Sequence, residues 1–175
     1  VAGFSKKGIA YIGVTRDDKA AGAAREDGFI AGLKNAGITL LEENKRISAF
    51  TLESGYEAAL DLLESKCDID VISCATDTIA AGAIEAIQTY LKKQVPANAA
   101  DAGARMRYIL ENTSIRVTGF GDNQMLKAVT GGIPTIHFGY KTSGIRGAEL
   151  LLDSIERGEQ IPIEMKLGFR LVGDR

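Results

Sequence analysis

The chain has 175 residues, of which 45% are hydrophobic and 25% are charged, so it can bury a sizeable core as one domain or two small lobes. Its formal net charge of −2 excludes a general electrostatic footprint for nucleic acid. No apolar run approaches the ~20 residues that a membrane span needs, and the start lacks a charged-then-apolar secretion signal. We therefore expect a globular protein without a membrane partner.

The residues that usually carry covalent or metal chemistry are sparse. Cys67 and Cys74 do not form a Cys-x-x-Cys pair, so we expect a reduced protein with Cys74 in a buried strand and no disulfide. The single histidine, His137, cannot build a metal cluster by itself. Dinucleotide, phosphate-loop and nucleophile-elbow motifs are all missing. We expect no cofactor, no metal and no enzymatic activity.

The first ninety residues alternate between strand-like and helix-like patterns. We predict strands at 8–14, 47–50 and 71–75, and helices over 20–36, from 51 or 54 onward, and from 79 to 90. Such a βαβαβα order predicts a parallel sheet with right-handed crossovers. Between the third strand and its helix, either Thr76 or Asp77 can cap the helix. The same two residues also lie where ligands of open α/β sheets bind.

Residues 97–114 interrupt this alternation, and we expect a short surface helix or a mobile loop there. The alternation then resumes with strands at 115–120 and 133–138 around a short helix at 124–129. A long helix starting at Thr142 or Ser143 and ending at Gly158 carries an apolar face, and the alternating tail 164–172 is typical of a strand.

Polar and aromatic side chains follow the carboxyl ends of the predicted strands. These ends share one edge of a doubly wound sheet, so we expect the side chains to converge on a hydroxyl-rich ligand such as a sugar. The candidates are Asp17, Arg25, Phe50, Thr76, Asp122 and Phe138. Taken singly, each also has a purely structural interpretation as a surface salt bridge, core ring, cap or turn.

Six segments in order carry a resemblance to a known family. They are Ile9–Val14, Ala24–Phe29, Ser54–Ala59, Ala75–Ile84, Val117–Asn123 and Pro134–Phe138. This series resembles the effector-binding core of the lactose-repressor/galactose-repressor family of bacterial transcription regulators, and its finer details are similar to sucrose or trehalose repressors. The resemblance implies an α/β fold: a parallel-sheet, periplasmic-binding-protein-like C-terminal lobe with helices on both faces.

The resemblance also implies roles for individual residues. Arg25 matches the arginine that binds effector hydroxyls, and Phe50 falls where an aromatic ring packs on the sugar. Thr76 stands at a polar effector-binding position, and Asp77 after it is then expected to cap the helix. Gly121 departs from the family's aspartate, which leaves Asp122 as the neighbouring candidate. Phe138 falls on the strand that leads back to the other lobe.

The same resemblance divides the chain. It implies a C-terminal lobe at 1–138 with an inserted segment at 97–114, a crossover helix at 139–161 and return strands at 162–175. The family's DNA-binding headpiece and most of its N-terminal lobe have no counterpart, so the crossover helix needs another cover, such as a dimer partner or the inserted segment. Small residues at 80–83 are expected to let a neighbouring chain approach closely.

Three functions stay open from the sequence. The first is the sugar-sensing, dimerising region of a cytoplasmic repressor, which binds a disaccharide or sugar phosphate and reaches operator DNA only through a headpiece. The second is an extracytoplasmic sugar-binding protein of a transport system. The third is an unrelated flavodoxin-like α/β enzyme.

Overall fold

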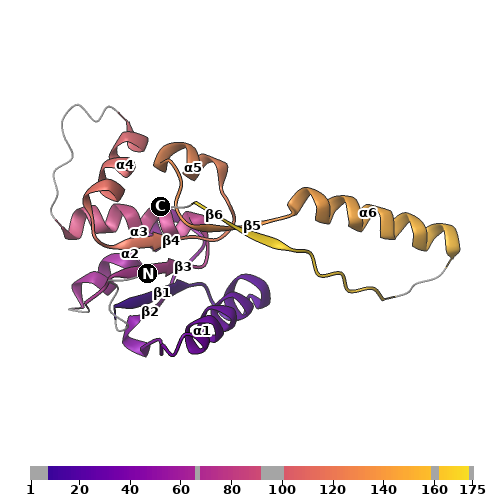
Figure 1. Cartoon of the computed structure of the whole chain (residues 1–175), viewed down its shortest axis with the longest axis horizontal. Coiled ribbons are helices and arrows are strands. Elements are labelled where there is room, and N and C mark those ends of the chain that lie inside the picture. Colours follow the sequence, from indigo (N-terminus) through magenta and orange to yellow (C-terminus); the bar gives the residue numbers. More distant parts are fainter. Residues whose placement is uncertain (1–7, 66–67, 92–100, 159–161, 174–175) are drawn as a thin grey trace.

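A computed structural model describes residues 8–65, 68–91, 101–158 and 162–173 (Figure 1). The elements follow in this order: β1 Ile9–Gly13, a π-helical segment Lys19–Ala24, α1 Arg25–Asn35, a 3-10 turn Glu42–Asn44, β2 Lys45–Ile47, α2 Leu52–Glu64, β3 Val71–Cys74, α3 Asp77–Tyr90, α4 Ala102–Asn112, β4 Arg116–Thr118, α5 Gln124–Thr130, β5 Thr135–Phe138, α6 Tyr140–Arg157 and β6 Phe169–Val172.

The main sheet is parallel, with strand order β2-β1-β3-β4, which confirms the predicted α/β fold with a parallel sheet. Beyond β4 the edge continues through β5. The Gly119 and Gly121 amides donate to the carbonyls of Pro134 and Ile136, each at 2.9 Å. β5 then pairs antiparallel with β6, so the chain leaves and re-enters the globular body through a two-stranded ribbon.

Helices cover both faces of the main sheet. On one face, Tyr11 of β1 stacks on Phe29 of α1 with ring centroids 5.0 Å apart. On the other face, the side chains of Ala10, Ile12 and Ile72 are fully buried. They belong to the core that includes residues of α2 and α3. Figure 1 shows α1 on the opposite side of the sheet from α2 and α3.

Backbones approach most closely where α2 meets α3. A Cβ added at Gly82 would lie 2.1 Å from the Leu52 carbonyl oxygen, and one at Gly55 would lie 2.7 Å from that of Ile79. The small residues at 80–83 are all buried inside the chain. The expectation that they receive a neighbouring chain is therefore wrong, because α2 of the same chain already occupies their surface.

The segment that interrupts the predicted pattern contains α4, and its residues 97–100 lie outside the described part. Asp101 caps α4 by accepting from the Ala104 amide at 2.7 Å. Met106 and Ile109 are buried where α4 packs against α3 and α5. A surface helix is thus confirmed for 102–112, but it covers α3 and α5 and not the apolar face of α6.

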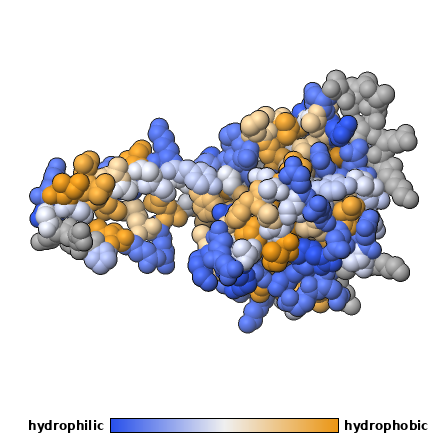
Figure 2. Space-filling view, turned by 180° about the vertical axis from the view of Figure 1, so that it is seen from behind, coloured by the Kyte–Doolittle hydropathy of each residue, from blue (hydrophilic) through white to orange (hydrophobic). Residues whose placement is uncertain are grey.

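Helix α6 projects from the body as an arm, with the chain returning beside it toward β6 (Figure 1). None of its described residues is buried. Its apolar face comprises Ile145, Leu151, Leu152 and Ile155, of which Ile155 is 67% exposed. The space-filling view shows hydrophobic side chains gathered over this arm (Figure 2). Within the described residues, no other element covers the apolar face of α6.

Two local predictions need correction or completion. The second strand is Lys45–Ile47 and not 47–50, because its register with β1 pairs Tyr11 with Lys45 and Gly13 with Ile47. Cys74 is buried as predicted, and burial raises the pKa of its thiol above the usual range. Cys67 lies outside the described residues.

Candidate functional site

A groove of about 640 Å³ opens over the α1 face of the sheet, between α1 and the β5–β6 ribbon. We call it the sheet groove. Its floor is Tyr11, Ser73 and Thr118 of three neighbouring strands, and Gly28 and Phe29 of α1 form one wall. At the carboxyl ends of the strands its mouth reaches Arg25, Phe120 and Phe138, which we call the carboxyl edge.

Arg25 is fixed at this carboxyl edge. Its guanidinium donates to the carbonyl of Ala75 at 2.6 Å and lies 4.0 Å from the centre of the Phe120 ring. Partial burial lowers the pKa of this guanidinium, which nevertheless stays charged because arginine titrates far above neutral pH. Only one of the five N–H groups of Arg25 donates to Ala75. The guanidinium is therefore fixed in position while its other N–H groups can donate to ligand hydroxyls.

Aromatic rings continue the edge from Arg25. The rings of Phe120 and Phe138 lie 4.8 Å apart at 48°, and Tyr140 meets Phe138 edge-on at 5.9 Å. The Tyr140 hydroxyl donates to the Gly121 carbonyl at 3.4 Å. Such rings offer flat apolar surfaces beside a hydrogen-bonding cation, which is the combination that suits one face of a sugar ring.

The turn after β3 divides its two polar residues between different tasks. Thr76 is the N-cap of α3, and its Oγ1 accepts from the Ile79 amide at 3.2 Å. Asp77 is buried and accepts from the Thr135 hydroxyl at 2.7 Å and from the Asn123 amide at 2.5 Å. The expectation that Asp77 caps the helix is wrong, since it ties the β4–α5 loop to β5 instead.

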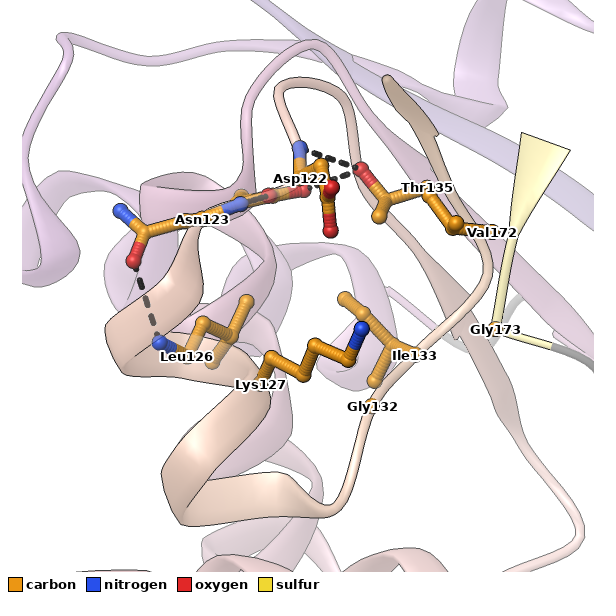
Figure 3. A pocket seen from close by; sticks show the side chains of 10 residues that line it. Asp122, Asn123, Leu126, Lys127, Gly132, Ile133, Thr135, Val172 and Gly173 are labelled. Atoms are coloured by element: carbon orange, nitrogen blue, oxygen red, sulfur yellow. Dashed lines mark hydrogen bonds between the residues drawn. The ribbon is translucent and has the colours of Figure 1, made fainter. Parts of the chain in front are cut away.

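Asp122 is drawn into the body beside this tie. It adopts a left-handed conformation with φ 53°, its carboxylate lies 2.7 Å from Nδ1 of His137, and its amide donates to Thr135. Figure 3 shows Asp122 and Thr135 facing one another above a pocket of about 20 Å³. A cavity of this size has room for one water and not for a sugar. Asp122 therefore orders the loop behind the edge and does not line the sheet groove.

Two other predicted site residues lie away from the groove. Phe50 is half exposed and follows β2, the outermost strand of the sheet. Asp17 is exposed in the loop after β1, where its carboxylate accepts from the Thr15 hydroxyl at 3.2 Å. The structure thus brings Arg25 and Phe138 together, and it leaves Asp17, Phe50, Thr76 and Asp122 outside the groove lining.

Sequence reasoning missed Phe120 and Tyr11. Both stood within predicted strands, where a nearly continuous apolar run does not reveal which face each side chain takes. The sequence did contain a signal for Phe120: the turn residues Gly121 and Asp122 follow it directly, which places Phe120 at the carboxyl end of its strand. Tyr11 had none.

Comparison with known proteins then places the chain. The family model described as "Periplasmic binding proteins and sugar binding domain of LacI family" matches residues 2–166. The chain therefore belongs to this family of binding domains. This agrees with the predicted resemblance to lactose and galactose repressors, and it does not favour the flavodoxin-like enzyme.

Individual relatives are transcription repressors. The chain is 28% identical over 136 residues to the sucrose operon repressor of Staphylococcus xylosus, covering 78% of this chain and 36% of the relative. It is 29% identical over 154 residues to the repressor PurR of Yersinia enterocolitica, covering 88% and 40%. A solved complex of the transcriptional regulator CelR with cellobiose shares the fold, with a TM-score of 0.76 at 23% identity and coverage of 95% and 46%. The chain thus spans less than half the length of these relatives.

Among the described residues, no group of three or more His, Cys, Asp or Glu side chains is arranged to hold a metal ion. None of the helices in the described ranges is both long enough and apolar enough to cross a membrane.

Proposed function

We propose that this chain is the effector-sensing region of a sugar-responsive transcription repressor, and that its carboxyl edge forms one wall of the sugar site. The observation that carries the proposal is Arg25, a charged donor held by the Ala75 carbonyl and flanked by the rings of Phe120 and Phe138. Family membership and the repressor relatives support it.

The ligand we propose is a disaccharide, with a sugar phosphate as the alternative. The names of a sucrose operon repressor and of a cellobiose-bound regulator support the disaccharide. The rings of Phe120 and Phe138 suit stacking on one sugar unit, while Arg25 donates to its hydroxyls. Of the other candidates, Thr76 lies nearest in sequence to this edge, directly after Ala75.

We infer the following division of the chain. Residues 1–138 make up the C-terminal effector lobe, 139–161 a crossover helix and 162–175 the return to the lobe. In the complete repressor, sugar binding would favour one relative lobe orientation, which a homodimer passes to DNA-binding headpieces in the cytoplasm. The chain itself acts by binding and not by catalysis.

Titration of the chain with sucrose, trehalose and cellobiose, followed by amide chemical shifts in NMR, tests the proposal. One wall of a cleft supplies few contacts, so we expect dissociation constants of about 1 mM, equivalent to roughly 4 kcal/mol of binding free energy. The shifts should concentrate at Arg25, Phe120 and Phe138. Arg25→Ala should weaken binding about tenfold or more, because it removes a charged hydrogen-bond donor.

Lys34→Ala provides the matched control, since it removes one positive charge from the last turn of the same helix. It should leave the titration unchanged. If none of the three sugars changes the chemical shifts, or if Arg25→Ala shows the same changes as the unaltered chain, the carboxyl edge is not the sugar site. Micromolar affinity of the chain for a disaccharide would contradict the one-wall interpretation.

A further inference from the structure

We propose that the floor of the sheet groove is a second sugar subsite, where the hydroxyl groups of Ser73 and Thr118 bind the second unit of a disaccharide whose first unit lies at the carboxyl edge. The inference rests on the proposed function, because it takes the carboxyl edge as the place of the first unit. It adds two residues that determine specificity, since a ligand with a single sugar unit at the edge does not reach them.

The floor of the groove carries hydroxyl groups where apolar side chains are usual. Tyr11, Ser73 and Thr118 are neighbours in register across β1, β3 and β4. The row one residue earlier, on the other face of the same strands, consists of three buried apolar residues: Ala10, Ile72 and Val117. Parallel strands that helices cover on both faces are usually apolar on both. Packing alone therefore does not account for the hydroxyl row.

The fold uses little of the hydrogen-bonding capacity of this row. The Thr118 hydroxyl donates to the Ser73 hydroxyl at 3.1 Å, and both side chains are partly exposed. A hydroxyl group can donate one hydrogen bond and accept two, so the pair retains capacity for the hydroxyls of a ligand. On the groove wall that α1 forms, Gly28 and Phe29 bring no polar side chain to meet them.

Tyr11, at the end of the row, is a second sign that the groove takes a polar ligand. Its hydroxyl is buried and has no hydrogen-bond partner within the described residues. Burial, together with the Glu26 carboxylate, raises the pKa of Tyr11 to about 12, although the charge of Arg25 opposes the rise. The hydroxyl therefore keeps its proton at neutral pH and remains a donor. A buried donor without an acceptor costs free energy, which a ligand oxygen in the groove offsets.

The floor continues directly from the carboxyl edge. Thr118 lies two residues before Phe120, and two residues of extended chain span about 7 Å with their side chains on the same face. The amides of Gly119 and Gly121 donate to β5 on either side of Phe120, which keeps this stretch extended. A ligand whose first unit packs on Phe120 therefore places its next unit over Thr118.

The groove has the room and the walls for a second sugar unit. Its volume of about 640 Å³ lies within the roughly 300–1,000 Å³ of small-molecule sites. Phe29 and Ile136 are apolar wall residues, and Gly28 leaves open space beside α1. An aromatic ring packs on the apolar face of a sugar while nearby hydroxyls bind its polar rim, so this wall and floor together suit a sugar.

Titration of the chain with sugars of one and two units, followed by amide chemical shifts in NMR, tests the subsite. Methyl glucoside supplies one unit, whereas sucrose, trehalose and cellobiose supply two. We expect the tightest-binding disaccharide to bind about fivefold more tightly than methyl glucoside, because it makes further hydrogen bonds. Both kinds of ligand should shift the amides of Arg25 and Phe120, and only the disaccharide should also shift those of Ser73 and Thr118.

Variants of the floor separate the two units. Thr118→Val removes a hydroxyl while keeping the shape of the side chain, and should weaken disaccharide binding about threefold to tenfold without changing methyl glucoside binding. Ser73→Ala should give the same result. Thr113→Val is the matched control, because Thr113 is also partly exposed but lies outside the groove lining, where it accepts from the Ile115 amide at 3.1 Å. Circular dichroism establishes that each variant is folded.

The outcomes distinguish this inference from the proposed function. If methyl glucoside binds at the carboxyl edge and no disaccharide binds more tightly, the second subsite is overturned while the edge remains the sugar site. The same conclusion follows if Thr118→Val and Ser73→Ala both keep the full preference for the disaccharide, or if they weaken both ligands equally. If no sugar binds the chain, the subsite and the proposed function fall together.

Discussion

Single residues decide how the loops behind the carboxyl edge are held. Asp77 carries the most, since one buried carboxylate binds the Thr135 hydroxyl and the Asn123 amide and thereby joins the start of α3, the β4–α5 loop and β5. The Asp77 carboxylate also packs against Gly119: a Cβ added at Gly119 would lie 2.1 Å from Oδ1 of Asp77, so only glycine fits there. Its role is structural, in the loops directly behind the carboxyl edge.

Asp77→Ala should lower the free energy of unfolding by about 2–4 kcal/mol, because it leaves buried donors without an acceptor. Urea denaturation followed by circular dichroism measures the loss. Thr78→Ala is the control, since Thr78 is the exposed next residue on the same helix and should change stability by less than about 0.5 kcal/mol. Equal effects from both variants would deny Asp77 this role.

At the scale of elements, α2 and α3 depend on a contact without side chains. At Gly82 the two helices approach so closely that only hydrogen fits between the backbones. This contact buries the small residues of α3 inside the chain and fixes the helix layer beneath β1 and β3.

Gly82→Ala should destabilise the fold by about 1–3 kcal/mol, because the added methyl group forces the two helices apart. Gly32→Ala in α1 makes the same chemical change where the Cβ meets open space, and should stabilise by about 0.5–1 kcal/mol. Thermal unfolding of both variants gives the comparison. A neutral Gly82→Ala would show that the helices can separate without cost.

Elements whose signals are local were predictable from the sequence. Gly131 and Gly158 as helix ends and the parallel alternation appear in the structure, whereas the cap of α3 is Thr76 and not Asp77 as expected. β2 was misplaced because its position follows from pairing with β1, and the Asn44 side chain also binds the Ile9 carbonyl across that boundary. Such distant partners leave no local pattern.

The candidate site was predictable only in part, for a related reason. Arg25 and Phe138 converge because α1 and β5 both adjoin the groove. Phe50 does not, since β2 is the far strand of the order β2-β1-β3-β4, and strand order is a property of the whole sheet. Asp122 does follow the carboxyl end of β4, as predicted, but its carboxylate points toward His137 and away from the groove.

The whole molecule consists of a packed body and an arm that differ in how many side chains they bury. The body holds all the buried hydrophobic side chains of the described residues, while the arm holds none. Segments with few buried contacts open at little cost in free energy.

Trypsin should therefore cut the arm first when the chain is diluted. Lys141, Arg146, Arg157 and Lys166 are exposed there. Mass spectrometry of a time course should show early loss of fragments from 141 onward and a persistent body. First cleavage inside α2 or α3 would contradict this order of stability.

The β5–β6 ribbon gives the arm a mechanical property of its own. Two paired strands join the arm to the body, so the arm is attached at two points of the chain and not through a single linker. His137 is paired with Arg170 in that ribbon and with Asp122 in the body. The ribbon that carries the arm is therefore tied through His137 to Asp122 in the loop behind the carboxyl edge.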